Sequence, residues 1–195
     1  MNNTFPFTAI VGLELAKRSL LFHAVDPRLG GLLLMGHRGC AKSTLARAFR
    51  EILPAPIYSE MSPFVEVPLG TSEDRLLGSI DASSLLENGK WSAQSGLIEQ
   101  ANGGVLYIDE VNLLPDHLVD SILDSAASGQ HRIERDGLSQ TVNARYILIG
   151  SMNPEEGDLR PQLTDRFTHG IMVRDDFSVE QRREIVRLRM EFDDD

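Results

Sequence analysis

The stretch GHRGCAKST, residues 36–44, decides the fold of this 195-residue chain. It lies between a short apolar run, residues 31–35, and a helical pattern over residues 43–53. The stretch matches the phosphate-loop template G-x-x-x-x-G-K-[ST] at its first glycine, its lysine and its serine. A loop between a buried strand and a helix turns its backbone N–H groups toward a phosphate, at the positive end of the helix. The sequence therefore predicts a nucleotide-binding site at residues 36–44.

The residues of this loop carry different parts of the predicted site. We expect Lys42 to reach the β- and γ-phosphates of a nucleotide and Ser43 to hold Mg²⁺. Gly36 and Gly39 supply the sharp turns, whereas Ala41 replaces the usual glycine before the lysine. Because Ala41 stands where the helix begins, we expect helical backbone angles that tolerate a Cβ atom, with weakened nucleotide affinity as the alternative. The predicted phosphate contacts are Gly36, His37, Arg38, Gly39, Cys40, Ala41, Lys42, Ser43 and Thr44.

Composition restricts the class of protein. The 195 residues, 42% of them hydrophobic, suffice for one sizeable core. The net charge of -10 disfavours nucleic acid as a partner, because unspecific binding needs clustered Lys and Arg. No apolar run approaches the ~18 residues of a membrane span, and residues 1–8 show no secretory signal. The single cysteine, Cys40, rules out an intramolecular disulfide, so we expect a soluble cytoplasmic protein.

A second apolar run, residues 105–108, ends in two adjacent acids, Asp109 and Glu110. This is the Walker B pattern. We expect Asp109 to bind Mg²⁺, directly or through water, and Glu110 to polarise the attacking water as general base. An acidic helix cap after a strand is the alternative for the pattern alone, but its place after a phosphate loop favours the catalytic interpretation.

A third apolar run, residues 146–149, leads to Asn153, which precedes a proline. In the expected sheet, this strand end lies between the phosphate loop and the two acids. We therefore predict that Asn153 orients the lytic water, the role called sensor 1. A turn-forming Asn before Pro is the alternative.

The stretch LRPQLTDRF, residues 159–167, contains two arginines that could serve a neighbouring subunit. An arginine that reaches a neighbour's γ-phosphate stabilises the charge of the transition state and makes catalysis depend on assembly. Arg166 is the first candidate for this arginine finger and Arg160 is the alternative. We expect Asp165 to orient Arg166 across the interface. The alternative for each arginine is a surface ion pair, which contributes little.

The rest of the chain indicates an α/β fold. Further helices are predicted at residues 12–25, 72–77, 96–101, 115–127 and 178–190, and further strands at residues 64–67 and 170–173. Two hairpins are predicted at residues 85–94 and 132–143, with Asn88-Gly89 and Asp136-Gly137 at their turns. Short apolar strands alternating with helices indicate a mainly parallel five-stranded sheet covered on both faces. Ligands bind such sheets at the carboxyl ends of the strands, where the predicted site residues lie.

Taken together, these motifs resemble those of the AAA+ ATPases. The segment FTAIVG, residues 7–12, is similar to the segment that lines the adenine pocket in that group, which implies Val11 and Gly12 as further nucleotide contacts. More narrowly, the chain resembles the ATPase motor subunit family of magnesium chelatase over nearly its whole length. The stretches that carry this resemblance are residues 5–7, 24–28, 68–70, 73–76, 109–114, 123–129, 153–157 and 159–167.

This resemblance implies a hexameric ring that hydrolyses ATP with Mg²⁺. The ring would support a larger subunit that inserts Mg²⁺ into protoporphyrin IX, the committed step toward chlorophyll. The implied partners are further copies of the chain and the other chelatase subunits, in the cytoplasm or in the plastid stroma. In this family the two hairpins project from the core toward ring partners.

Three features depart from the family pattern: Ala41, a short segment at residues 54–64, and an end at Asp195 before the helical lid that carries a second sensor arginine. We therefore expect one nucleotide-binding domain over residues 1–195. If the lid is truly absent, we expect hydrolysis by this chain alone to be poor.

Three other functions stay open: a MoxR-type remodelling or maturation ATPase, a cobalt-chelatase-like subunit, and a non-catalytic chelatase adaptor. The adaptor is disfavoured because every predicted catalytic and metal-binding residue is present. These residues are Lys42, Ser43, Asp109, Glu110, Asn153 and Arg166. A GTPase is disfavoured because the chain has no Asn-Lys-x-Asp motif.

Overall fold

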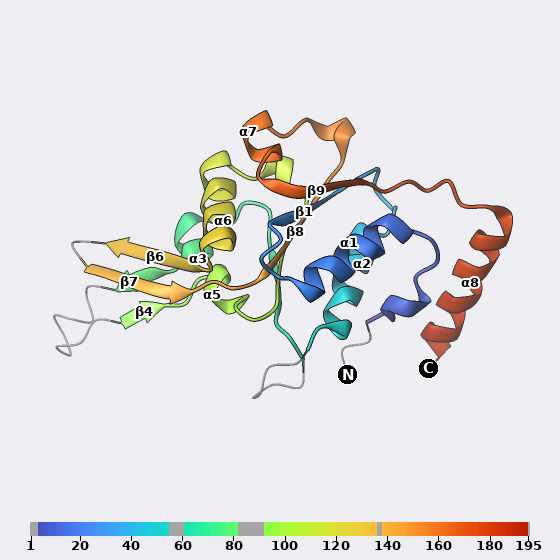
Figure 1. Cartoon of the computed structure of the whole chain (residues 1–195), viewed down its shortest axis with the longest axis horizontal. Helices are drawn as coiled ribbons and strands as arrows, with labels where there is room; N and C mark the ends of the chain where they lie inside the picture. Colours follow the sequence, from blue (N-terminus) through green and yellow to red (C-terminus); the bar gives the residue numbers. More distant parts are fainter. Residues whose placement is uncertain (1–3, 55–60, 82–91, 136–137, 195) are drawn as a thin grey trace.

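The protein is built on a parallel sheet of five strands (Figure 1), whose order is β2-β5-β8-β1-β9. A computed structural model describes residues 4–54, 61–81, 92–135 and 138–194 of the chain. The strands of the sheet are β1 (Gly31–Met35), β2 (Phe64–Val67), β5 (Val105–Ile108), β8 (Ile147–Met152) and β9 (Phe167–Met172). All four strand pairs are parallel, so the predicted five-stranded α/β sheet is confirmed.

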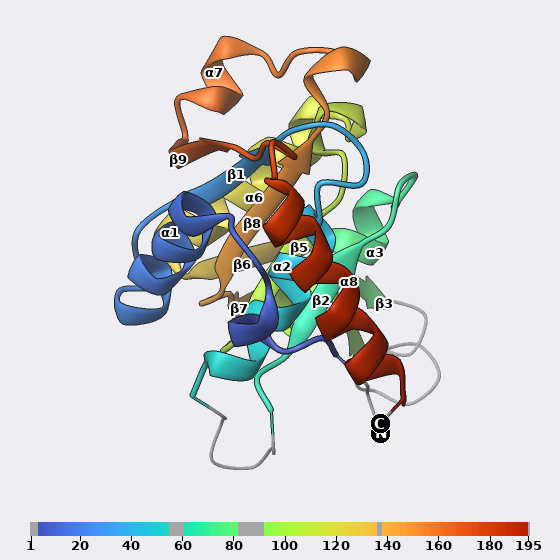
Figure 2. The ribbon, with the colours of Figure 1, turned by 90° about the vertical axis from the view of Figure 1, so that its right-hand side faces the viewer.

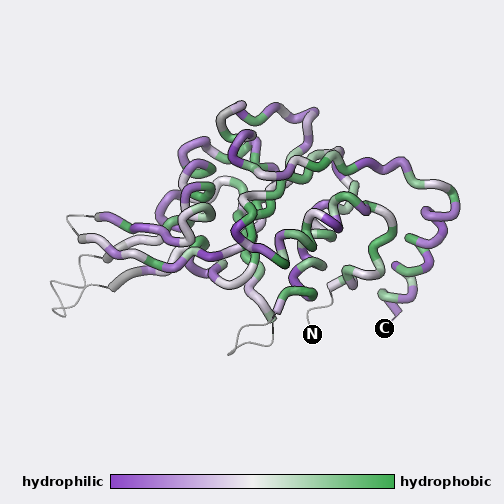
Figure 3. The backbone as a smooth tube through the Cα atoms, viewed as in Figure 1, coloured by the Kyte–Doolittle hydropathy of each residue, from purple (hydrophilic) through white to green (hydrophobic). Residues whose placement is uncertain are grey.

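The central strands are apolar throughout because both of their faces are covered. Successive side chains point to opposite faces, so Leu33 and Leu148 join one core cluster and Leu32 and Ile149 join the other. In Figure 3 the central strands are hydrophobic along their length, whereas the projecting hairpin strands are more polar.

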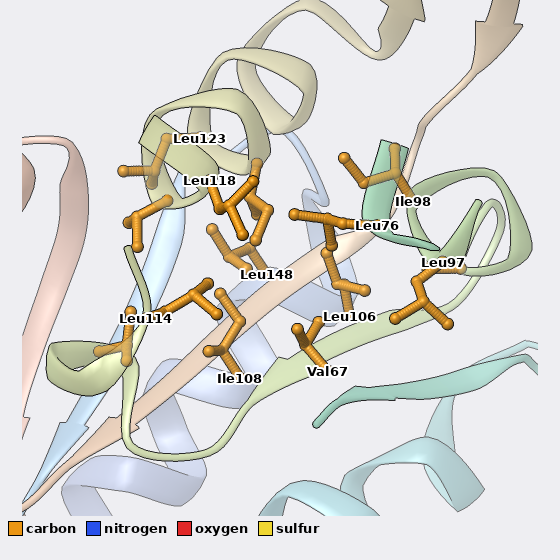
Figure 4. Close-up of a cluster of buried hydrophobic side chains, with 14 of the residues drawn as sticks. Val67, Leu76, Leu97, Ile98, Leu106, Ile108, Leu114, Leu118, Leu123 and Leu148 are labelled. Carbon is orange, nitrogen blue, oxygen red and sulfur yellow. The ribbon is translucent and has the colours of Figure 1, made fainter. Parts of the chain in front are cut away.

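Helices cover both faces of the sheet (Figure 2). Residues of η1 (Phe7–Ala9), α1 (Glu14–Val25) and α2 (Lys42–Phe49) pack into one core cluster. Residues of α3 (Glu73–Leu77), α5 (Leu97–Gln100) and α6 (Asp116–Ser128) pack into the other, where Leu118 and Leu123 of α6 lie over the strands (Figure 4). The loop between β1 and α2, residues 36–41, therefore leads into a helix that is anchored on one face of the sheet.

Helix boundaries differ from the predicted ones where backbone conformation intervenes. The first helix begins at Glu14 rather than at Gly12, because Gly12 and Leu13 have left-handed φ angles of 70° and 57°. The helix predicted over residues 43–53 ends at Phe49 and continues as a 3-10 turn, η2 (Arg50–Ile52). The predicted glycine stop of α6 is confirmed, since Gly129 caps the helix with φ 70°.

Two antiparallel hairpins project from the core, away from the C-terminal helix (Figure 1). They are β3 (Ser79–Asp81) with β4 (Ser92–Gln94), and β6 (Gln130–Arg135) with β7 (Leu138–Asn143). The first hairpin begins earlier than the predicted residue 85. The second ends at the predicted Asn143 but begins at Gln130, two residues before the predicted start. The predicted turns Asn88-Gly89 and Asp136-Gly137 lie outside the described residues.

The C-terminal helix α8 (Val179–Asp194) lies at the periphery, and none of its residues is buried. It meets the N-terminal segment through Phe192, whose ring centroid lies 5.2 Å from that of Phe5. Among the described helices, none combines the length and the apolarity that crossing a membrane would require.

Candidate functional site

The three predicted motifs meet at the carboxyl edge of the sheet, around one cavity of about 400 Å³. Strand β8 lies between β1 and β5, so Asn153 falls between the phosphate loop and the two acids, as predicted. The lining residues are Arg38, Gly39, Cys40, Ala41, Lys42, Ser43, Thr44, Asp109, Glu110, Ser151, Met152 and Asn153. The volume lies in the range of small-molecule and cofactor sites.

The loop has an open concave side that suits a phosphate group. Gly39 has φ 85°, and apart from its two chain neighbours no described residue has an atom within 4 Å of the place where its Cβ would stand. The loop leads into α2, whose first turn supplies free backbone N–H groups at the positive end of the helix. The residues present therefore fit an anionic nucleotide tail.

The expectation for Ala41 was wrong. Ala41 is the N-cap of α2 and has φ 61° and ψ 22°, the left-handed conformation rather than the right-handed helical one. Its Cβ then crowds the neighbouring backbone, which costs roughly 1–2 kcal/mol relative to a relaxed conformation. The glycine that usually stands here avoids this cost, so Ala41 puts strain into the loop.

Lys42 is held inside the loop by two of the loop's own carbonyl groups. Its Nζ donates to the backbone oxygens of Gly36, at 2.6 Å, and of His37, at 2.8 Å. Neither partner is a carboxylate, so the ammonium charge has no anion beside it in these two contacts. A phosphate in the cavity would supply that anion.

Asp109 is fixed by two hydroxyl groups that sequence reasoning did not identify. Its Oδ1 accepts a hydrogen bond from the Tyr107 hydroxyl at 2.9 Å and one from Ser151 Oγ at 2.5 Å. Burial raises the pKa of the Tyr107 phenol, which keeps the group protonated as a donor. Both described bonds go to Oδ1, so Oδ2 remains available for a cation. Tyr107 lies two residues before Asp109, and Ser151 lies two residues before Asn153, so period-two alternation along the strands was the signal that could have found them.

Glu110 has an unusual backbone and a basic neighbour. Its φ is 54°, a left-handed value that is uncommon for a residue with a side chain. Its backbone N–H donates to Ser151 Oγ at 3.3 Å, and its Oε1 accepts from Arg38 Nη2 at 3.2 Å. The predicted general base thus lies beside the phosphate loop.

Asn153 is buried, and its side chain caps a short turn. Its Oδ1 accepts from the backbone N–H of Glu155 at 3.2 Å, at the start of η4 (Pro154–Glu156). Asn153 therefore both caps this turn and lines the cavity. Within the described residues, no three His, Cys, Asp or Glu side chains gather as a metal cage. A Mg²⁺ ion here would rely on Ser43, Asp109 and nucleotide oxygens, the usual mode for this ion.

The two arginine candidates lie on the acidic face of α6, away from the cavity. Arg166 Nη1 pairs with Asp124 at 2.7 Å and with Asp120 at 3.2 Å, and Arg160 Nε pairs with Asp116 at 2.5 Å. The described ion pairs of Arg166 therefore involve acids of α6. The expected contact of Asp165 with Arg166 across a subunit interface stays a prediction.

Some predicted nucleotide contacts do not line the cavity. Gly36 and His37 contribute their carbonyl groups to Lys42 but lie outside the lining, as do Val11 and Gly12. A Cβ on Gly12 would come within 2.8 Å of Cε1 of Phe177. Cys40 is buried in the core cluster of α2, which favours a packing role over redox chemistry.

The comparisons with known proteins agree with this architecture. A family model described as AAA domain (dynein-related subfamily) matches residues 31–167. A chain in a cryo-EM-based model of the complex between subunits BchI and BchD of magnesium chelatase is 45% identical, with a TM-score of 0.83. The match covers 96% of this chain and 67% of that one.

Two curated relatives are informative in different ways. The magnesium-chelatase 38 kDa subunit of Chlorobaculum tepidum is 46% identical over 225 aligned residues, which cover 98% of this chain and 57% of that protein. The uncharacterized protein Rv2850c of Mycobacterium tuberculosis is 47% identical over 191 residues, which cover 98% of this chain and 30% of that protein. The chain thus spans only part of each relative.

Proposed function

This chain belongs to the AAA family, and on that premise we propose that it is the ATP-hydrolysing core of a motor subunit that serves a magnesium chelatase. The observation that carries the proposal is the meeting of Lys42, Asp109, Glu110 and Asn153 around one cavity. Motifs far apart in the sequence supply a phosphate-binding lysine, a metal-binding acid, a base and a water-orienting amide. Their combination suits the attack of water on a phosphate better than nucleotide binding alone.

In the proposed reaction Lys42 leaves the carbonyl groups of the loop and donates to the β- and γ-phosphates of ATP. Ser43 and Asp109 would hold Mg²⁺, which supplies charge neutralisation at the phosphates when it is bound. Tyr107 and Ser151 keep Asp109 in place through Oδ1. Asn153 orients the attacking water and Glu110 accepts its proton, while the water oxygen bonds to the γ-phosphorus and ADP leaves with the bridging oxygen.

Arg166 supports a proposal of catalysis shared between subunits. It directly precedes Phe167, which pairs with Gly31 at the start of β1, whereas the phosphate loop follows Met35 at the other end. Five residues of strand separate the two positions, or roughly 16 Å at ~3.3 Å per residue. Arg166 would therefore serve the cavity of a neighbouring copy. A head-to-tail contact of this kind closes into a ring, and the family resemblance suggests six subunits.

The chelatase assignment is supported by relatives whose names state that activity. Subunits named for magnesium chelatase, from Chlorobaculum and from Cereibacter, are 46% and 43% identical to this chain. We propose that the motor acts on other chelatase subunits and so assists Mg²⁺ insertion into protoporphyrin IX.

A second candidate is a remodelling ATPase that prepares a different metalloenzyme. The alignment with the Chlorobaculum subunit runs over 225 residues, more than the 195 of this chain, so that subunit carries inserted residues. The alignment with the mycobacterial protein runs over 191 residues and needs no insertion of that size. In this respect the chain is closer to a relative whose name states no chelatase activity. We predict that the residues inserted in the Chlorobaculum subunit lie opposite residues 54–64 of this chain.

Two assays test the proposal in sequence. The first measures Mg-ATP hydrolysis per mole of protein as the protein concentration rises. We expect the specific activity to climb, because neighbouring copies complete each site. The second replaces the 38 kDa subunit with this protein in reconstituted Chlorobaculum chelatase. Magnesium insertion supports the chelatase motor, whereas hydrolysis without any insertion supports the remodelling ATPase. A flat and low ATPase rate would overturn both.

A further inference from the structure

Arg38 stands at the centre of an ion-pair cluster that the proposed reaction has not used. A single nitrogen, Nη2, donates to Glu110 Oε1 at 3.2 Å and lies 2.8 Å from Glu156 Oε1. The Arg38 side chain is 73% exposed, whereas Glu110 is 19% and Glu156 is 24% exposed. An accessible guanidinium thus bridges two largely buried carboxylates at the mouth of the cavity.

Glu156 is placed to hold Arg38 rather than to face solvent. It ends the 3-10 turn η4, and its Oε2 is buried with no hydrogen-bond partner among the described residues. A buried carboxylate is costly unless a cation compensates it, and Arg38 is the cation beside it. This arrangement fixes the direction from which Arg38 approaches Glu110.

The same turn contacts the phosphate loop at a second position. His37 Nδ1 lies 3.2 Å from Glu155 Oε2, and the backbone N–H of Glu155 donates to Asn153 Oδ1. Two consecutive acids of η4 therefore face two consecutive residues of the loop. Asn153, the loop and Glu110 become parts of one network, with Arg38 as the member that touches the base.

Glu110 needs such support because of its conformation. A residue with φ 54° lies in a sparsely populated region, which persists when its surroundings hold it. The bond from Ser151 holds the Glu110 backbone. The described hydrogen bond to the Glu110 carboxylate comes from Arg38.

We propose that Arg38 is a positioning residue for Glu110, and that Glu156 holds Arg38 in place. Arg38 occupies Oε1 of the base and leaves Oε2 for the attacking water. The orientation of the base then depends on the conformation of the phosphate loop. This inference rests on the proposed ATPase function, and it adds a role for a loop side chain whose backbone alone serves the phosphate template.

The test compares four substitutions in the full protein, each checked for folding by a thermal melt. We expect Arg38→Gln to lower kcat roughly 10- to 100-fold, the size of effect expected for a lost charged hydrogen bond. Glu156→Gln should lower kcat less, and Arg38→Lys should recover part of the loss. Glu184→Gln is the control, because it removes a glutamate that pairs with an arginine, Arg187, on α8 and outside the cavity lining, and it should stay within about twofold of wild type. The dissociation constant of a fluorescent ATP analogue, measured without turnover, should change little in all four.

A further substitution identifies the group through which Arg38 acts. In the Glu110→Gln background, Arg38→Gln should cause no further loss, since the base is already gone. The inference is overturned if Arg38→Gln matches wild type, or if it raises kcat, as an inhibitory latch would. It is also overturned if the analogue binds much more weakly while kcat is retained, as for a direct phosphate contact. If the wild type hydrolyses no ATP at any concentration, the proposed function fails and this inference fails with it.

Discussion

The nucleotide cavity and the arginine face on α6 are built in opposite ways. Around the cavity, Asp109 accepts hydrogen bonds from two hydroxyl groups on strands of the sheet. On the arginine face, Arg160 and Arg166 form ion pairs with aspartates at positions 116, 120 and 124, one turn apart on the exposed face of α6. Arg160 is 71% exposed and Arg166 is 45% exposed.

This difference separates the part of the proposed site that one chain completes alone from the part that it would supply to a neighbouring chain. Hydrogen bonds inside a sheet preorganise a site before any ligand arrives. Exposed ion pairs contribute about 0–1 kcal/mol, so an arginine held by them is free to exchange its partner for a phosphate. In the proposed mechanism the cavity is therefore the prepared half of a catalytic site, and the arginine face is the half that would become useful on assembly.

The largest expected effect comes from the arginine face. Arg166→Ala should lower kcat by roughly 10³- to 10⁵-fold, the range measured for arginine fingers. Nucleotide binding, followed with a fluorescent analogue, should be unchanged because Arg166 lies at the other end of β1 from its own loop. Arg160→Ala is the matched control. A larger loss of kcat in Arg160→Ala than in Arg166→Ala would identify Arg160 as the arginine finger instead.

The next effect comes from the base in the cavity. Glu110→Gln should lower kcat by roughly 10²- to 10⁴-fold, the usual contribution of a general base. Because the amide keeps the shape of the side chain, ATP should still bind, and a filter-binding assay would detect it. Normal hydrolysis by this variant would remove Glu110 from the mechanism.

A smaller effect should follow from loosening Asp109. Ser151→Ala should raise the Mg²⁺ concentration that gives half-maximal hydrolysis roughly tenfold, because one charged hydrogen bond of about 1.5 kcal/mol is lost. Tyr107→Phe should act in the same direction. Tyr146→Phe is the control, since Tyr146 is also a buried tyrosine bonded to a serine, Ser125, but lies away from the cavity. An unchanged Mg²⁺ titration in both Asp109-directed variants would show that the hydroxyl groups do not prepare the metal site.

The smallest effect concerns strain in the loop. Ala41→Gly should stabilise the folded protein by about 1 kcal/mol, because glycine accepts the left-handed conformation without the Cβ clash. Urea unfolding with and without ATP would measure it. A destabilised variant would mean that Ala41 is not strained in solution.

Much of this picture was predictable from the sequence. Apolar runs before the phosphate loop, before Asp109 and before Asn153 predicted three neighbouring parallel strands, and the structure places their ends together. Such runs can be recognised in a sequence because a strand covered on both faces is apolar at every position.

The rest depended on contacts between distant segments. Alternation along β8 puts Ser151 on the same side as Asn153, but it does not show that Ser151 bonds to Asp109 at the end of the neighbouring strand, or that Arg166 lies against α6. The conformation of Ala41 was mispredicted because the position before a helix was treated as part of it, although N-cap residues have non-helical angles. The acids that hold Arg166 are exposed, and an exposed acid in a sequence has no unique partner.

The shared site is tested most directly by mixing two inactive variants. Arg166→Ala retains an intact cavity, and Glu110→Gln retains an intact arginine. When they are mixed in equal amounts, about a quarter of the head-to-tail interfaces join an intact cavity to an intact arginine. The account predicts that ATP hydrolysis returns to about that fraction of the wild-type rate if the interfaces act independently. A mixture as inactive as its two components, at concentrations where wild type assembles and hydrolyses ATP, would contradict a site shared between neighbouring copies.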